Sequence, residues 1–259
     1  MANARLLYNL DAWDAATVTG SSQANTDLAA SNVLHDHVAK PWRTTGKASE
    51  NIVFDLGSAK QITVFSMFTF NLTSSATVTL QANASNSWGS PSYSQALTMA
   101  TNADSEVLER VVFFLSQTYR YWRVTLADAG NSDSYLQIGR IAAGTYYEAG
   151  RNIDQGFSIV TVDPSEGDRT PGRQTFFRAR KRFRRASVAF RLQDQTQTDK
   201  LSAVMDKVGN RKPIVLALDP TSRPTKDSMY CYLVTPISQT HQFIGNYSTA
   251  ALVFEEKTE

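Results

Sequence analysis

The chain has 259 residues, of which 42% are apolar, and it contains 13 Phe and 10 Tyr. This composition can fill one large core or two ordinary ones, and it favours a folded chain over an intrinsically disordered one. The net charge of +2 hides an asymmetry, because residues 1–148 hold nine Lys and Arg against twelve Asp and Glu, whereas residues 149–259 hold seventeen against twelve. Opposite net charges of −3 and +5 predict two domains, residues 1–148 and 149–259, with different partners.

The N-terminal residues lack the apolar core of a signal peptide, and the longest apolar runs, residues 111–115 and 214–218, are far too short to span a bilayer. We therefore expect synthesis in the cytoplasm and no membrane insertion. Cys231 is the single cysteine, which excludes an intrachain disulfide framework.

Residues 1–50 are rich in Asn, Asp, Ser, Thr and Ala, and they predict loops with a short capped helix near residues 31–34. From Asn51 onward the pattern changes to short runs rich in β-branched and aromatic residues, separated by Gly, Asn, Ser and Asp. Six strands are predicted, at residues 52–57, 61–70, 76–82, 107–115, 121–126 and 136–141. This spacing is typical of an antiparallel β-sandwich or jelly roll.

The first domain resembles the discoidin, or galactose-binding-like, jelly roll over about residues 20–147. The resemblance rests on the order of four segments: Lys40-Pro41-Trp42-Arg43, residues 50–57 ending in Asp-Leu-Gly, residues 78–83 followed by Trp88, and residues 119–124. It implies a binding site for sugars or acidic lipid head groups in loops at one end. The carbohydrate-binding candidates are Trp42, Arg43, Trp88 and Tyr93, and the alternative is that Trp42 and Trp88 anchor the edge of the core.

Many members of that family hold calcium in an early Asp-Gly loop, but this chain has His35-Asp36-His37 there and lacks the Gly. Two His at i and i+2 without a convincing third ligand predict a solvated loop rather than a transition-metal site. We therefore expect no metal and no cofactor.

The second domain predicts a small α+β barrel with one helix. A strand at residues 156–164 precedes a polar loop at 165–173, and apolar residues at i, i+3, i+4 and i+7 predict a helix over residues 194–210. Further strands are predicted at residues 212–220, 229–234 and 247–256.

The most unusual segment, residues 176–192, carries seven Lys and Arg among its seventeen residues. Alternation along its second half predicts one long half-buried strand, with the cations on the other face at a spacing of roughly 6.6–6.8 Å. The basic residues are Arg178, Arg180, Lys181, Arg182, Arg184, Arg185 and Arg191, and the inward residues are Ala186, Val188, Phe190 and Leu192. The cationic row is interpreted as an assembly or channel-facing surface, and a nucleic-acid site is the alternative.

The order of elements over residues 150–256 resembles the tail-tube-like barrel of bacteriophage distal tail and baseplate hub proteins. The resemblance implies a homo-oligomeric ring around the tail channel, a hexamer rather than a trimer, with tube, tape measure and hub proteins as partners. DNA would be a transient passenger, and the location would be the virion tail. In such a ring the cationic strand would face DNA or acidic residues of a neighbouring subunit, such as Glu255 and Glu256.

Motifs for a nucleophile elbow, a zinc-binding His-Glu helix, a P-loop and a dinucleotide fingerprint are absent from the sequence. We therefore predict no enzyme, although a carboxylate pair that includes Asp128 or Asp133 stays open. The leading function is a structural component of a phage tail tip whose jelly roll binds carbohydrate or another tail protein. The alternative is a soluble carbohydrate-binding protein that its second domain anchors to a partner.

Overall fold

The computed structural model describes residues 3–153, 157–191, 193–236, 238–243, 246–249 and 251–258. The chain forms two compact units, unit 1 (Met1–Glu148 and Val215–Ser228) and unit 2 (Ala149–Ile214 and Met229–Glu259). The chain first passes from unit 1 to unit 2 at the expected boundary, residue 148. Residues 215–228 belong to unit 1 again, which the sequence did not predict. That residues 1–148 and 149–259 are independent domains stays a prediction.

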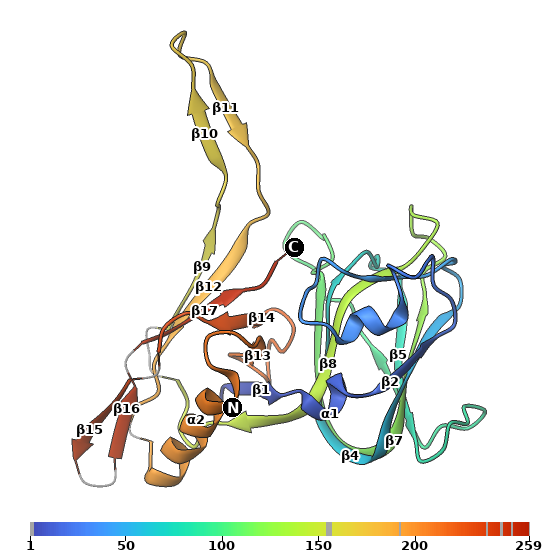
Figure 1. Cartoon of the computed structure of the whole chain (residues 1–259), viewed down its shortest axis with the longest axis horizontal. Helices are drawn as coiled ribbons and strands as arrows, with labels where there is room; N and C mark the ends of the chain where they lie inside the picture. The colour runs from blue at the N-terminus through green and yellow to red at the C-terminus, as the bar shows by residue number, and fades with distance from the viewer. Residues whose placement is uncertain are drawn as a thin grey trace. The chain divides into compact units, whose positions relative to one another are not determined.

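Unit 1 is an antiparallel β-sandwich whose long strands curve around a common core (Figure 1). The helical segments are α1 (Asp11–Asp14) and a 3-10 turn at Ala30–Leu34. The strands are β1 (Arg5–Asn9), β2 (Thr17–Gly20), β3 (Trp42–Arg43), β4 (Glu50–Phe70), β5 (Thr77–Asn83), β6 (Tyr93–Leu97), β7 (Arg110–Ala127), β8 (Gln137–Glu148) and β13 (Ile214–Ala217).

Alternation of side chains along the strands builds the core of unit 1. Trp122 and Phe54 point inward from β7 and β4 and are fully buried, as is Trp13 of α1. The rings of Trp13 and Phe54 lie 4.5 Å apart, centroid to centroid. Burial of these large aromatic side chains stabilises the sandwich, and the alternation leaves the intervening residues facing away from the core.

Two long bent strands replace four of the predicted short ones. Residues 52–57 and 61–70 belong to β4, and residues 107–115 and 121–126 fall largely within β7, so the prediction of separate strands was wrong. Gly57 adopts φ +73°, and its N–H donates to Asp55 Oδ1 at 2.8 Å, as the Asp-Leu-Gly sequence suggests. The strand pairing shifts register between Asp55 and Lys60, so this feature bends β4 instead of ending it.

The first 50 residues contain more structure than predicted. The expected short helix near residues 31–34 is the 3-10 turn, but Arg5–Asn9 is a strand rather than a loop. Within unit 1, β1 pairs with both β8 and β13. Strand β1 is short and has polar neighbours, so it offers too few alternating residues to be recognised as a strand from the sequence.

Unit 2 contains strands and one long helix, α2 (Gln195–Val208). Its strands are β9 (Ser158–Val162), β10 (Glu166–Arg169), β11 (Thr175–Arg178), β12 (Phe183–Val188), β14 (Ser228–Leu233), β15 (Gln239–Phe243), β16 (Asn246–Thr249) and β17 (Leu252–Glu256). The prediction of a mainly β chain, with a sandwich followed by an α+β part with one long helix, is confirmed.

Residues 158–188 form a long β-hairpin, called the arm below, which extends away from the rest of unit 2 (Figure 1). Strand β9 pairs with β12 at its base, and β10 pairs with β11 nearer the tip. The polar loop predicted at residues 165–173 therefore includes β10. The basic segment was predicted as one long strand, but it forms two strands, β11 and β12. Pro164 has no N–H to donate to the ladder, which explains why pairing lapses between the two parts.

The apolar side of the basic segment faces inward as predicted. Ala186, Val188 and Phe190 are buried, whereas Leu192 lies outside the described residues. Within α2, Leu201, Val204 and Val208 are buried and form the predicted stripe.

Helix α2 begins at an N-cap, where the Asp194 carboxylate accepts from the Gln197 N–H at 2.8 Å. We predict that Asp194→Ala lowers the free energy of unfolding by about 1 kcal/mol, because it leaves this N–H without its partner. Chemical denaturation of the full chain measures the change. Asp206→Ala, at an exposed position late in the helix, is the control, and an equal loss in both variants would contradict the capping role.

Candidate functional site

The four carbohydrate-binding candidates do not lie together. Trp42 is fully buried in the core, and its Nε1 donates to the Ser22 carbonyl at 2.8 Å. Tyr93 is partly buried and packs edge-on against Trp122 at 6.4 Å between ring centroids. The Trp42 ring therefore serves packing and is not an exposed platform, whereas a part in ligand binding for Tyr93 stays a prediction.

Arg43 belongs to a cluster at the start of β8. Its Nε and Nη2 donate to Gln137 Oε1 at 3.0 and 2.7 Å, and its guanidinium carbon lies 4.1 Å from the centre of the Tyr135 ring. The guanidinium is therefore held on two sides, by an amide and by an aromatic ring.

Trp88, between β5 and β6, belongs to a second cluster in which an arginine is again held by a glutamine and an aromatic ring. The arginine and glutamine of this cluster stand on β7 and β5. Arg123 Nε and Nη2 donate to Gln81 Oε1 at 2.8 and 2.6 Å, and its guanidinium carbon lies 4.6 Å from the centre of the Trp88 ring. The indole Nε1 donates to Asn86 Oδ1 at 2.8 Å, which fixes the ring in its plane. The Trp88 ring is only partly buried, so the part that Arg123 leaves uncovered is open to solvent.

Strand register sets these side chains on one surface. Gln81 of β5 lies opposite both Arg123 of β7 and Ser94 of β6, so all three project from the same side of the sheet. We call the surface formed by Gln81, Trp88, Ser94 and Arg123 the Trp88 face. Among the residues proposed from sequence, only Trp88 belongs to it.

Gln81 and Arg123 were missed from sequence as site residues. The alternation in Tyr121-Trp122-Arg123-Val124 could have placed Arg123 outward, because its two neighbours are apolar and buried. The pairing with Gln81 could not have been found, since it depends on the register between two strands forty residues apart in sequence.

A neighbouring ion pair on unit 1 neutralises its own charges. Arg120 Nε and Nη2 donate to Asp55 Oδ1 and Oδ2 at 2.7 and 2.9 Å. The hydrogen bond from Arg120, with that from the Gly57 N–H, lowers the pKa of Asp55 to about 2. Asp55 therefore stays ionised at neutral pH.

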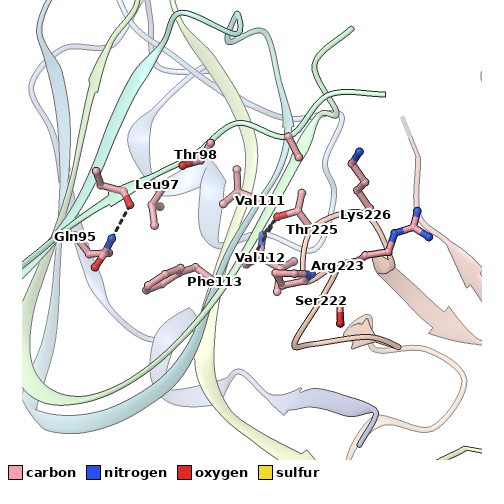
Figure 2. A pocket seen from close by; sticks show the side chains of 13 residues that line it. Gln95, Leu97, Thr98, Val111, Val112, Phe113, Ser222, Arg223, Thr225 and Lys226 are labelled. Atoms are coloured by element: carbon pink, nitrogen blue, oxygen red, sulfur yellow. Dashed lines mark hydrogen bonds between the residues drawn. The ribbon is translucent and has the colours of Figure 1, made fainter. Parts of the chain in front are cut away.

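Unit 1 also has a cleft of about 520 Å³ where β6, the first half of β7 and residues 222–226 meet (Figure 2). Some polar groups that line the cleft already bond to one another. Thr225 Oγ1 accepts from the Val112 N–H at 3.3 Å, and Gln95 Nε2 donates to the Ala96 carbonyl at 2.9 Å. Phe113 is the only aromatic side chain among the residues described as lining it. Polar side chains also line the cleft, those of Gln95, Thr98, Ser222, Arg223, Thr225 and Lys226, so it differs from the Trp88 face in having a phenyl ring rather than an indole beside its polar groups.

Several cations of the basic segment are paired within their own chain. Arg184 binds Glu256 at 2.6 Å, and Arg185 binds Glu255 at 2.6 Å. The two acidic residues that were expected to face cations of a neighbouring subunit are therefore occupied by these intrachain pairs.

Nearer the tip of the arm the cations are more exposed. Arg182 Nε lies 2.9 Å from Asp163 Oδ2, and Arg180 Nη2 lies 3.6 Å from Glu166 Oε1. Hydrogen bonds from Ser165, and then from Arg182, lower the pKa of Asp163 to about 2. Arg178, Lys181 and Arg191 are exposed, and their assignment to an assembly or channel surface stays a prediction.

Within the described part of the chain, no group of three or more His, Cys, Asp or Glu could hold a metal ion. His35 and His37 are exposed in a loop, and Asp128 is buried, where it accepts from the Thr73 N–H and hydroxyl at 2.8 and 2.7 Å. No helix among the described residues is long and apolar enough to cross a bilayer.

No protein-family model matches the chain, and no curated protein does. Similar solved structures include a chitosan-binding module from a Paenibacillus chitosanase/glucanase, with 20% identity, a TM-score of 0.38, and coverage of 50% of this chain and 95% of that one. A Streptococcus pneumoniae fucose-binding module has 12% identity, a TM-score of 0.41, and coverage of 51% and 96%. A Clostridium perfringens module in complex with GalNAc-β-1,3-galactose has 11% identity, a TM-score of 0.40, and coverage of 52% and 99%.

The depressed pKa of Asp55 predicts a pH dependence. Because the folded pKa of about 2 lies below the ordinary value of 3.8, the Asp55–Arg120 pair stabilises the fold above about pH 4, and this contribution is lost as the pH falls toward 2. The stability difference between the wild type and Asp55→Asn should therefore shrink over that window, as urea unfolding at each pH would measure. Asp104→Asn in an exposed loop is the control, and a difference that does not vary with pH would contradict the pairing.

Proposed function

We propose that this chain binds carbohydrate through the Trp88 face and carries out no chemical step. The observation that carries the proposal is a partly exposed indole flanked by planar polar groups. A sugar ring presents a flat apolar face that packs on an aromatic ring, and its hydroxyl groups hydrogen-bond to amide and guanidinium groups around that ring.

The Trp88 face is also pre-organised. Arg123 is fixed by two hydrogen bonds to Gln81 and by the indole, and both polar residues stand on paired strands rather than on loops. Side chains held in this way lose little conformational freedom when a ligand arrives, so more of the contact energy appears as affinity.

We predict that Trp88→Ala lowers affinity for the bound glycans at least about tenfold, because it removes the aromatic anchor. A glycan array followed by titration calorimetry on the full chain measures the effect. Tyr135→Ala is the matched control, since Tyr135 holds the corresponding place beside Arg43. Glycan binding that both variants keep unchanged would overturn the assignment of the site, and the absence of glycan binding by the wild type would overturn the function.

We further propose that the arm docks this chain into a multi-subunit particle. Its strands expose large apolar side chains, with Phe176 61%, Phe177 74% and Val160 54% exposed. A two-stranded hairpin is marginal in water by itself, and exposed aromatic residues of this kind typically mark a contact surface. The resemblance of residues 150–256 to phage distal tail and hub proteins makes a ring in a virion tail tip the leading form of this assembly.

This second proposal predicts that the Phe176→Ser, Phe177→Ser double variant loses self-association while its circular dichroism spectrum and its glycan binding stay unchanged. Mass photometry and light scattering of the purified chain measure the assembly state. Arg169→Gln, an exposed substitution on the same hairpin, should leave assembly intact. A wild-type chain that stays monomeric over the accessible concentration range would rule out self-assembly through the arm.

A further inference from the structure

Arg123 is a cation without a counter-ion among the residues that the structure describes. Its contacts are the two hydrogen bonds to Gln81 Oε1 and the stacking on Trp88, and no carboxylate among the described residues pairs with it. Nη1 makes no hydrogen bond to the part of the chain that the structure describes. A full positive charge and a free donor are thus presented beside the aromatic ring.

The neighbouring charged residues do not neutralise the positive charge of Arg123. Asp55 lies on the next strand, but Arg120 binds it through two short hydrogen bonds and neutralises it. Arg123 is itself partly buried, and this burial alone lowers its pKa, without any contribution from a nearby charge. A partly desolvated guanidinium gains more from an arriving anion than a fully hydrated one does, because the effective dielectric around it is lower.

We infer that the ligand of the Trp88 face is an anionic saccharide, whose carboxylate or sulfate ester binds Arg123 while its ring stacks on Trp88. The inference rests on the proposed carbohydrate-binding function and adds charge selectivity to it. Gln81 acts as a positioning residue, since it turns the guanidinium so that Nη1 points away from the amide that binds Nε and Nη2.

The same chain supplies a matched control for this charge. Arg43 has the same fork of hydrogen bonds to a Gln Oε1 and the same stacking on an aromatic ring, but it lies on β3 beside β8 rather than on β7 beside β5. Replacing either arginine by glutamine removes one charge and two hydrogen bonds from a similar environment. Only Arg123 adjoins Trp88.

The test is an array that pairs anionic oligosaccharides with their neutral forms: galacturonic acid oligomers with their methyl esters, and sulfated galactose oligomers with unsulfated ones. The wild type should bind the anionic member of a pair about tenfold more tightly, because a charge-assisted hydrogen bond is lost in the neutral form. Arg123→Gln should abolish this ratio, Arg123→Lys should keep part of it, and Arg43→Gln should leave it unchanged. Preference for the carboxylate or the sulfate series identifies which anion is bound.

The preference for the anionic saccharide should also weaken as salt is added. The Arg123 side chain is partly exposed, and the screening length is about 10 Å at 0.1 M salt. Equal binding of anionic and neutral members, lost in Trp88→Ala, would overturn the charge selectivity and leave the carbohydrate function standing. An anionic preference that survives Arg123→Gln would also overturn it. The absence of binding to any glycan on the array would overturn the proposed function and this inference with it.

Discussion

The register of β7 between β4 and β5 is the constraint on which both the core of unit 1 and its candidate site depend. Trp122 lies opposite Phe54 on one side and Ala82 on the other, and all three are buried. Arg123, one residue later, must then point outward and meet Gln81. A shift by one residue would bury the guanidinium and expose the indole of Trp122, at a large cost in desolvation and lost packing, so the core itself fixes the site.

The two units bury their apolar surface to different extents. In unit 1 the aromatic side chains are buried or half-buried, and Trp88 is the only partly exposed indole among the four. The arm of unit 2 carries exposed Phe and Val side chains together with arginines. A rigid enclosed sandwich suits the recognition of a small ligand, whereas an apolar hairpin suits contact with another protein, and the opposite net charges of the two halves agree with different partners.

Much of the fold could be predicted from local pattern. The alternating strands of unit 1, the apolar stripe of α2 and the inward parity of Ala186, Val188 and Phe190 depend on residues close in sequence. The bend of β4 could not, because a positive-φ glycine such as Gly57 ends or bends a strand according to its partner strand. The break in the basic segment could not either, because it depends on Pro164 in the other strand of the hairpin. For the site, Trp88 was found as an aromatic between strands, but its partners Gln81 and Arg123 meet only through tertiary register.

Trp88 also provides the most direct test of the central claim, since Trp13, Trp42 and Trp122 are at most 1% exposed and are protected from a quencher in water. Acrylamide quenching of tryptophan fluorescence, with and without a bound anionic oligosaccharide, therefore reports on the Trp88 ring. We expect the ligand to remove most of the accessible quenching and Arg123→Gln to weaken this protection. A saccharide that binds the chain while Trp88 stays equally open to acrylamide would contradict the central claim.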